Sequence, residues 1–231
     1  VLNIAQYAAF KDNHAVAMFS LEMSKEQLVT RLMASESMVD SQQMRTGDLR
    51  DSDWEKLLEG AALIGNSKLI IDDTATTLAE IRSKCRKYKQ TYGIELVVID
   101  YLQLMSGSES RRNESRQQEI SEISRSLKSL ARELDIPVIA LSQLSRAVEQ
   151  RPDKRPMLSD LRESGAIEQD ADVVMFIYRD DYYNKDSKEI GIAEINVAKQ
   201  RSGPTGVVKL AWLPDYTKFA NLEKRYQTNE G

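Results

Sequence analysis

The sequence is poor in the residue types that build disulfide frameworks and histidine-based metal sites. Its 231 residues include one cysteine, Cys85, and one histidine, His14. A single cysteine excludes an internal disulfide and fits a reducing cytosol. A single histidine excludes a His-rich metal centre, and it permits a histidine-dependent catalytic triad only if His14 itself serves. We therefore expect a cytoplasmic protein.

Long apolar runs and a dominant charge are also missing. No run approaches the length that crosses a bilayer and no signal peptide is visible, so no membrane partner is expected. The net charge of −4 gives no global sign of nucleic-acid binding, and any such surface must be local, inside a groove or pore. With 41% hydrophobic and 29% charged residues, the chain is typical of a soluble globular protein. Its length fits one domain over residues 1–231.

Strand-like and helix-like segments alternate along the chain. Apolar runs predict strands at residues 15–20, 69–72, 96–100, 137–142, 172–178, 192–199 and 205–213. Capping boxes predict helix starts at Ser24 with Gln27, at Ser52 with Glu55, and at Thr77 with Glu80. Apolar spacings of three and four predict an amphipathic helix over residues 116–134. The alternation predicts an α/β fold with a mostly parallel central sheet flanked by helices, followed by a late antiparallel hairpin.

The apolar run at residues 96–99 leads directly into Asp100. Such a run is typical of a strand buried on both faces, and its carboxyl end is where open α/β sheets bind ligands. A carboxylate at that point often holds the Mg²⁺ of a nucleotide, as in a Walker B motif. The alternative is an N-cap or turn aspartate.

Two further polar residues follow predicted strands, Glu22 and Gln143. Because parallel strands end at the same edge of a sheet, both could converge with Asp100 on one site. There Glu22 could polarise an attacking water, Asp100 could hold Mg²⁺ through its water shell, and Gln143 could sense a γ-phosphate. The alternatives are a surface charge for Glu22 and a strand-end hydrogen bond for Gln143.

Six short motifs occur in an order typical of one family. They are FSLEMS at 19–24, VIDYLQL at 98–104, ALSQLSR at 140–146, DLRESG at 160–165, IEQDAD at 167–172 and KQRSGP at 199–204. Together they resemble the motor domain of the bacterial replicative helicases, the DnaB family, over nearly the whole chain. RecA recombinases and circadian-clock ATPases share the core without this set.

The resemblance implies a RecA-like fold and a homohexameric ring that binds ATP between subunits and translocates on single-stranded DNA through a central pore. It implies that Glu22 is the catalytic base, Asp100 the Walker B aspartate, and Gln143 the link from the γ-phosphate to the DNA loops. Lys199 and Arg201 resemble the pair that reaches the γ-phosphate of the neighbouring subunit.

Other roles follow from the same resemblance. Arg31 resembles a residue that packs against the nucleotide base. Residues 160–165 are expected to line the pore, where Arg162 pairs with a phosphate and Gly165 lets the main chain approach the DNA. Glu163 is expected to orient a neighbouring arginine or to bind through its backbone amide. The alternative for this segment is a salt-bridged surface turn. A helicase loader and primase are the expected protein partners, primase mainly through a domain that these residues do not include.

One departure from the family is serious. The phosphate-binding loop G-x-x-x-x-G-K-[ST] belongs immediately before the predicted first helix, and these residues contain no such sequence. Residues 1–9 show helical spacing from the first residue, without a cap or an initiating methionine, which is typical of a chain cut inside a helix. We therefore expect no ATP turnover by these residues alone. A single-stranded-DNA recombinase and a non-catalytic ring or interaction module remain the alternatives to the helicase.

Overall fold

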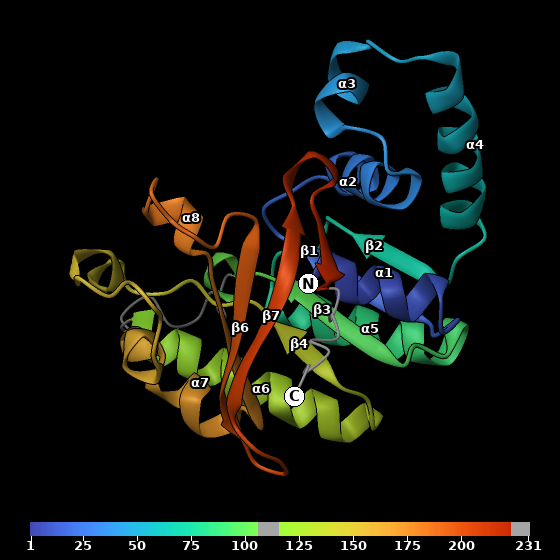
Figure 1. The fold of residues 1–231 in the computed structure, drawn as a ribbon. Coiled ribbons are helices and arrows are strands. Elements are labelled where there is room, and N and C mark those ends of the chain that lie inside the picture. Colours follow the sequence, from blue (N-terminus) through green and yellow to red (C-terminus); the bar gives the residue numbers. More distant parts are fainter. Residues whose placement is uncertain (106–115, 223–231) are drawn as a thin grey trace, which may run out of the picture.

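The structure is a computed structural model that describes residues 1–105 and 116–222, apart from the side chains of residues 162–164 (Figure 1). Its helices are α1 (Leu2–Phe10), α2 (Lys25–Ser37), α3 (Ser41–Thr46), α4 (Asp51–Gly65), α5 (Leu78–Tyr92), α6 (Arg116–Leu134), α7 (Gly165–Asp170) and α8 (Asp180–Tyr183). Its strands are β1 (Val16–Ser20), β2 (Leu69–Asp72), β3 (Leu96–Asp100), β4 (Val138–Ala140), β5 (Val173–Tyr178), β6 (Ile192–Gln200), β7 (Gly206–Leu213) and β8 (Lys218–Asn221). Short 3₁₀ helices are η1 (Leu102–Leu104), η2 (Arg146–Gln150), η3 (Leu158–Ser164) and η4 (Pro214–Tyr216).

Four strands form a parallel sheet in the order β2-β1-β3-β4. The central pair β1 and β3 is in register from Val16 opposite Leu96 to Ser20 opposite Asp100. Every residue of β1 is buried, and so are the first four of β3, because helices cover both faces of the sheet. The predicted buried strand that ends at Asp100 is confirmed.

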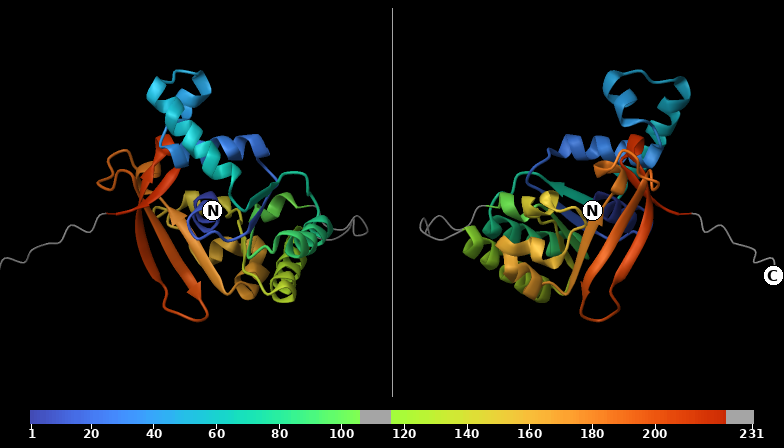
Figure 2. Two further views of the ribbon diagram at one scale, coloured as in Figure 1. Left: turned by 90° about the vertical axis from the view of Figure 1, so that its right-hand side faces the viewer. Right: turned by 60° about the vertical axis from the view of Figure 1, so that its left-hand side comes forward.

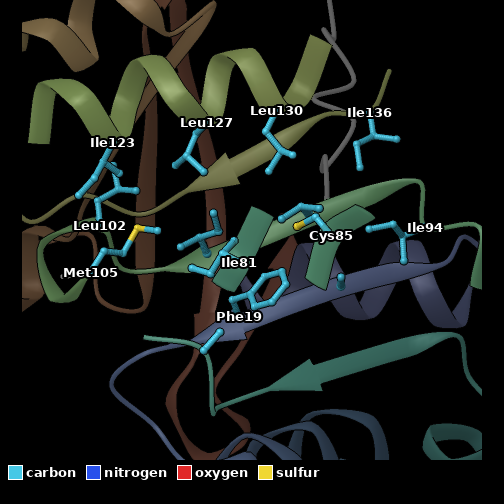
Figure 3. Close-up of a cluster of buried hydrophobic side chains, with 14 of the residues drawn as sticks. Phe19, Ile81, Cys85, Ile94, Leu102, Met105, Ile123, Leu127, Leu130 and Ile136 are labelled. Carbon is cyan, nitrogen blue, oxygen red and sulfur yellow. The ribbon is translucent and has the colours of Figure 1, made fainter. Parts of the chain in front are cut away.

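The two faces of this sheet pack against different helices. Phe19 on β1 and Ile99 on β3 face α5 and α6, where they join Ile81, Cys85 and Leu130 in one cluster (Figure 3). The alternate strand residues face the other way, onto α1 and the first turns of α2. That second cluster contains Ala5, Ala9, Val16, Met18, Leu28, Leu96 and Val98. The alternation of side chains along the strands therefore fixes which helices lie on which side.

The later strands form a separate antiparallel sheet in the order β5-β6-β7-β8. The predicted hairpin is its centre, β6 paired with β7, and β5 and β8 extend it on either side. Val174 and Phe176 on β5 pack against Leu161 of η3. The predicted α/β class with its late hairpin is confirmed, and the antiparallel part is larger than the sequence predicted.

Helices α3 and α4 stand at one end of the molecule, and the turn of the β6–β7 hairpin stands at the opposite end (Figures 1 and 2). The predicted capping boxes Ser24–Gln27 and Thr77–Glu80 are present. The predicted box at Ser52 is wrong, because α4 begins at Asp51 with Arg50 as its N-cap. None of the described helices combines the length and apolar character needed to cross a bilayer.

Candidate active site

The carboxyl ends of β1, β3 and β4 lie at one edge of the parallel sheet. β3 pairs in parallel with both β1 and β4, so the residues that follow the three strands are neighbours. Asp100 is the last residue of β3, Glu22 lies two residues beyond β1, and Gln143 lies three beyond β4. The prediction that these strands end together is confirmed. The chemical roles of the three residues stay predictions.

Asp100 is only partly exposed, and charged groups surround it. Burial raises the pKa of Asp100 above its ordinary value, and the negative charge of nearby Glu22 raises this pKa further. The positive charge of the Arg31 guanidinium works in the opposite direction. Arg31 lies on α2 and is exposed, and its charge acts on Asp100. The structure therefore brings Glu22, Asp100 and Arg31 into one electrostatic group.

The segment that carries Glu22 is held by its backbone. The amide of Leu21 donates a 2.7 Å hydrogen bond to the carbonyl oxygen of Asp100. The Ser20 hydroxyl donates to the carbonyl of Met23 at 2.7 Å and accepts from the Met23 amide at 3.2 Å. The Glu22 side chain itself is exposed and makes no hydrogen bond with any residue that the structure describes. A fixed turn with a free carboxylate suits a residue that acts on a ligand.

The amino end of α1 lies at the same edge. Val1, the residue before the helix, lies near the carboxylate of Asp100. Val1 is the N-cap of α1 and provides no side-chain hydrogen bond to the first turn. The first backbone N–H groups of a helix and its dipole favour anions. The edge thus combines carboxylates, which attract a cation, with a helix end that attracts an anion.

Gln143 is exposed, and its main chain is held by the side chain of Gln103. The Gln143 amide donates to Gln103 Oε1 at 3.0 Å, and Gln103 Nε2 donates to the Gln143 carbonyl at 3.3 Å. Gln103 Nε2 also donates to Ser142 Oγ at 2.9 Å. The side-chain amide of Gln143 makes no hydrogen bond with the described residues, so it is available to a ligand.

Lys199 and Arg201 lie in another part of the fold, at the carboxyl end of β6. Lys199 Nζ donates to the carbonyls of Glu168 and Gln169, and Arg201 Nη2 donates to the Gln169 carbonyl at 2.8 Å. Both cations therefore sit at the carboxyl end of α7, where the helix dipole favours positive charge. No ion pair or hydrogen bond within the described residues joins them to the Asp100 edge. Figure 1 shows the hairpin turn well away from the N-terminus.

Asp172 holds Arg201 in place. Its carboxylate pairs with Lys128 and lies 3.6 Å from Arg201 Nε, and the Arg201 amide donates to the Asp172 carbonyl at 3.0 Å. The Lys128 ammonium, followed by the Arg201 charge, keeps the pKa of Asp172 below its ordinary value. Arg201 still has an exposed side chain, so it can reach a group outside this chain.

The expected DNA-binding segment is only partly described. The side chains of Arg162 and Glu163 lie outside the described residues. Gly165 is exposed, and its φ of −53° is one that any residue adopts. Its surroundings are open, since a Cβ at this position would have no neighbour within 4 Å. The absent side chain therefore leaves room for a ligand, but the backbone conformation does not require glycine.

Comparison with known proteins identifies the family of this chain. The family model described as DnaB-like helicase C terminal domain matches residues 1–221. The chain belongs to this family. A replicative DNA helicase DnaB of Geobacillus stearothermophilus is 59% identical over 226 residues, which are 97% of this chain and 50% of that protein. A replicative DNA helicase DnaC of Bacillus subtilis (strain 168) is 57% identical, with 97% of this chain and 50% of that protein covered. The chain thus spans about half the length of these relatives.

Solved structures of the same kind resemble this fold. One of them, described as an ATPase domain, superposes with a TM-score of 0.89 at 46% identity, covering 96% of this chain and 80% of that one. A DnaB-like replicative helicase, described with its interactions with primase, superposes with a TM-score of 0.90 at 46% identity. That match covers 96% of this chain and 54% of the other. The RecA-like core expected from the motifs is confirmed.

Two residues of this DnaB-family domain were missed as parts of the site's framework. Gln103 lies within the motif at 98–104, but nothing in its spacing shows that its amide pairs with a distant backbone. Asp72 ends β2 as Asp100 ends β3, and this shared pattern was the available signal. Asp72 is 7% exposed, and Lys84 Nζ lies 2.7 Å from its carboxylate. Its oxygens also accept from Tyr88 and Thr74, so they are occupied by protein groups.

Proposed function

We propose that these residues form the single RecA-like motor domain of a replicative DNA helicase. In the full-length protein this motor uses ATP to translocate on single-stranded DNA as a homohexameric ring and unwinds the duplex at the replication fork in the cytoplasm. The observation that carries the proposal is Asp100, a partly buried strand-end carboxylate of raised pKa, crowded by Glu22 and faced by Arg31. Family membership supports the same assignment.

The edge fits a magnesium nucleotide. A partly buried carboxylate beside a second one is a place where a divalent cation relieves repulsion, and Asp100 would hold Mg²⁺ through its water shell. When bound, the metal neutralises charge on the phosphates of ATP. The amino end of α1 offers the complementary attraction for those phosphates. Arg31 packs against the nucleotide base.

Within the site, Glu22 acts as the base that orients and deprotonates the attacking water. Its exposed carboxylate and fixed backbone suit this task. Gln143 contacts the γ-phosphate with its free amide and passes that contact to the DNA-binding segment.

Lys199 and Arg201 complete the site of the neighbouring subunit. Arg201 is exposed and Lys199 is partly exposed, and in their own chain both donate hydrogen bonds to the carboxyl end of α7. A guanidinium that reaches a γ-phosphate stabilises the charge that develops in the transition state. This arrangement makes hydrolysis depend on ring assembly.

Residues 160–165 contact the DNA backbone inside the ring. Arg162 pairs with a phosphate, Gly165 leaves space for the strand, and Glu163 orients a neighbouring arginine or binds through its amide. Primase and a helicase loader are the proposed protein partners. The first partnership is supported by the related helicase structure, which was described with that protein's own interactions with primase.

The 231 residues alone are proposed not to turn over ATP, because they contain no G-x-x-x-x-G-K-[ST] sequence to bind the phosphates. For this polypeptide the absence favours a second function, a non-catalytic ring or interaction module. Both proposals are tested together by comparing ATP hydrolysis by these residues with hydrolysis by the full-length protein. Turnover by the short chain at about 1–100 per second would contradict the first of them.

The helicase proposal is tested with the full-length protein and a forked duplex. ATP-dependent unwinding by closed rings is expected, and Glu22→Gln should abolish it while nucleotide binding persists. Glu55→Gln, an exposed glutamate on α4, is the matched control and should unwind normally. Filaments that exchange homologous strands without unwinding would instead identify a recombinase.

A further inference from the structure

One side chain joins the backbone segments that follow β3 and β4. Gln103 lies in η1, three residues after Asp100, and its amide makes a reciprocal pair with the peptide groups of Gln143. A third bond runs from Gln103 Nε2 to Ser142 Oγ at 2.9 Å. The backbone adds a 3.0 Å bond from the Leu102 amide to the Leu141 carbonyl. The side chain therefore continues the β3–β4 pairing beyond the last paired residues.

A primary amide of this length satisfies both groups with one side chain. The Gln143 N–H needs an acceptor and its carbonyl needs a donor, and a glutamine side chain offers one of each in a single plane. The Gln103 backbone is itself anchored, because Arg116 donates to its carbonyl. The result is a rigid bridge that leaves the Gln143 side chain free.

The same segment continues into the proposed DNA-binding region. Two residues after Gln143, the Ser145 amide donates a 3.1 Å hydrogen bond to the carbonyl of Asp160 in η3. Asp160 is 6% exposed, and Arg151 grips its carboxylate with bonds of 3.0 and 2.8 Å. A short chain of hydrogen bonds thus connects the end of β3 to the start of the segment that leads to Gly165.

We propose that Gln103 is a positioning residue that couples the Asp100 edge to residues 158–165 through the main chain of Gln143. The proposal rests on the proposed function, in which the first region binds nucleotide and the second binds DNA. Gln103 touches neither ligand. By fixing the backbone of Gln143, it sets the direction of the Gln143 side-chain amide. It also transmits a displacement of the residues after β3 to the residues after β4.

The test uses the full-length hexamer and Gln103→Met, which keeps the length of the side chain and removes its amide. Gln90→Met on α5 is the matched control, since Gln90 is exposed and makes no side-chain hydrogen bond with the described residues. The first readout is hydrogen exchange in residues 158–165 with and without a non-hydrolysable ATP analogue. The second is ATP hydrolysis with and without poly-dT.

In the unaltered protein the analogue should change exchange in residues 158–165, and Gln103→Met should remove that change while the analogue still binds. KM for ATP should stay within about twofold. The poly-dT-stimulated kcat should fall about tenfold, the size expected when one or two hydrogen bonds are lost. In a Gln143→Ala background, Gln103→Met should cause no further loss of the poly-dT-stimulated kcat, because the Gln143 side chain that Gln103 positions is already absent.

An equal loss of the poly-dT-stimulated kcat in both backgrounds, or an analogue-dependent change in exchange that survives Gln103→Met, would overturn the proposal. So would an unaltered protein in which the analogue leaves residues 158–165 unchanged. If Gln103→Met does not form hexamers, Gln103→Glu replaces it, because it keeps the acceptor for the Gln143 amide and opposes the Gln143 carbonyl with an oxygen. A protein without poly-dT stimulation would refute the helicase function, and the exchange readout would still decide the role of Gln103.

Discussion

The amide of Leu21 donates a 2.7 Å hydrogen bond to the carbonyl oxygen of Asp100. This bond continues the β1–β3 pairing by one step, past Ser20 opposite Asp100. Because Glu22 follows Leu21, the backbone places it close to Asp100, and the charges of the two carboxylates repel each other.

That repulsion predicts a change in stability. The raised pKa of Asp100 means that the folded protein binds a proton more tightly than the unfolded chain, so stability falls as pH rises from the ordinary value through the raised one. Glu22→Gln removes the neighbouring charge and lowers the pKa of Asp100. The Tm of the full-length protein at pH 7 should therefore rise, on the order of 1–2 °C. Calorimetry at several pH values measures this Tm, with Glu55→Gln as the control. An equal rise in Tm for Glu22→Gln and Glu55→Gln would contradict the interaction between Glu22 and Asp100.

A second prediction concerns the partition of the site between subunits. In the full-length protein, Glu22→Gln and Arg201→Ala should each abolish hydrolysis and spare nucleotide binding. Rings mixed from the two variants contain some sites with an intact Glu22 beside an intact Arg201, and partial ATPase activity should return. Arg45→Ala on α3, an exposed arginine, is the control for loss of a positive charge. Mixed rings no more active than either variant, after confirmed subunit exchange, would contradict a role in trans.

A third prediction concerns Asp72, which stabilises the end of β2. Burial opposes its ionisation, but hydrogen bonds from Lys84, Tyr88 and Thr74 outweigh that effect and hold its pKa well below the ordinary value. Its contribution to stability is therefore present above pH 4, approximately, and is lost as pH falls towards the lowered value. Tyr88→Phe should destabilise the protein by about 1 kcal/mol at pH 7 and weaken this acid dependence. Acid titrations of the Tm of both proteins measure the effect.

Tyr88 offers a second readout of the same contact. Burial, followed by the hydrogen bond to Asp72, raises the pKa of Tyr88 to about 12. The unfolded chain loses its tyrosine protons at lower pH, so stability should decline between about pH 10 and the raised value. Ultraviolet titration of tyrosinate, compared between the unaltered protein and Tyr88→Phe, isolates this group. A single titration near pH 10 in the folded protein would contradict the contact.

Regular elements were predictable where packing on a sheet face dictates the pattern. Helix α6 occupies residues 116–134 as its apolar spacing predicted, since its buried apolar side chains face the cluster around Phe19. The start of α4 was predicted wrongly. The sequence offers the Ser52–Glu55 box, but Asp53 turns back and accepts from the Arg50 amide at 3.2 Å. Two local capping signals overlap there, and the one that the structure uses begins two residues earlier, at Arg50.

The sequence allowed us to predict the site residues that follow a strand. It did not allow us to predict a residue whose side chain contacts the backbone of a neighbouring strand's loop. Glu22, Asp100 and Gln143 follow apolar runs, so parallel pairing alone brings them to one edge. The role of Gln103 depends on contact between segments 40 residues apart, which no periodicity reveals. Strand β8 was missed because its four residues are too short to form a pattern before they pair with β7.

The final prediction concerns the segment at residues 160–165 and its grip on DNA. Its alternative, a salt-bridged surface turn, loses one candidate pair, because the buried carboxylate of Asp160 is already bound by Arg151. If Arg162 in each subunit of a hexamer holds one phosphate, the slope of log affinity against log salt should be about −4, from roughly −0.7 per phosphate on a single strand.

Arg162→Ala should flatten that slope and weaken poly-dT and mixed-sequence strands alike, because phosphate contacts carry no base information. The measurement is a salt titration of strand binding by the full-length protein with a non-hydrolysable ATP analogue. Arg45→Ala removes the same charge at an exposed position on α3 and should leave the slope unchanged if the effect is local. A slope that Arg162→Ala leaves intact would return this segment to a surface turn. A loss confined to one base composition would instead mean that Arg162 reads bases.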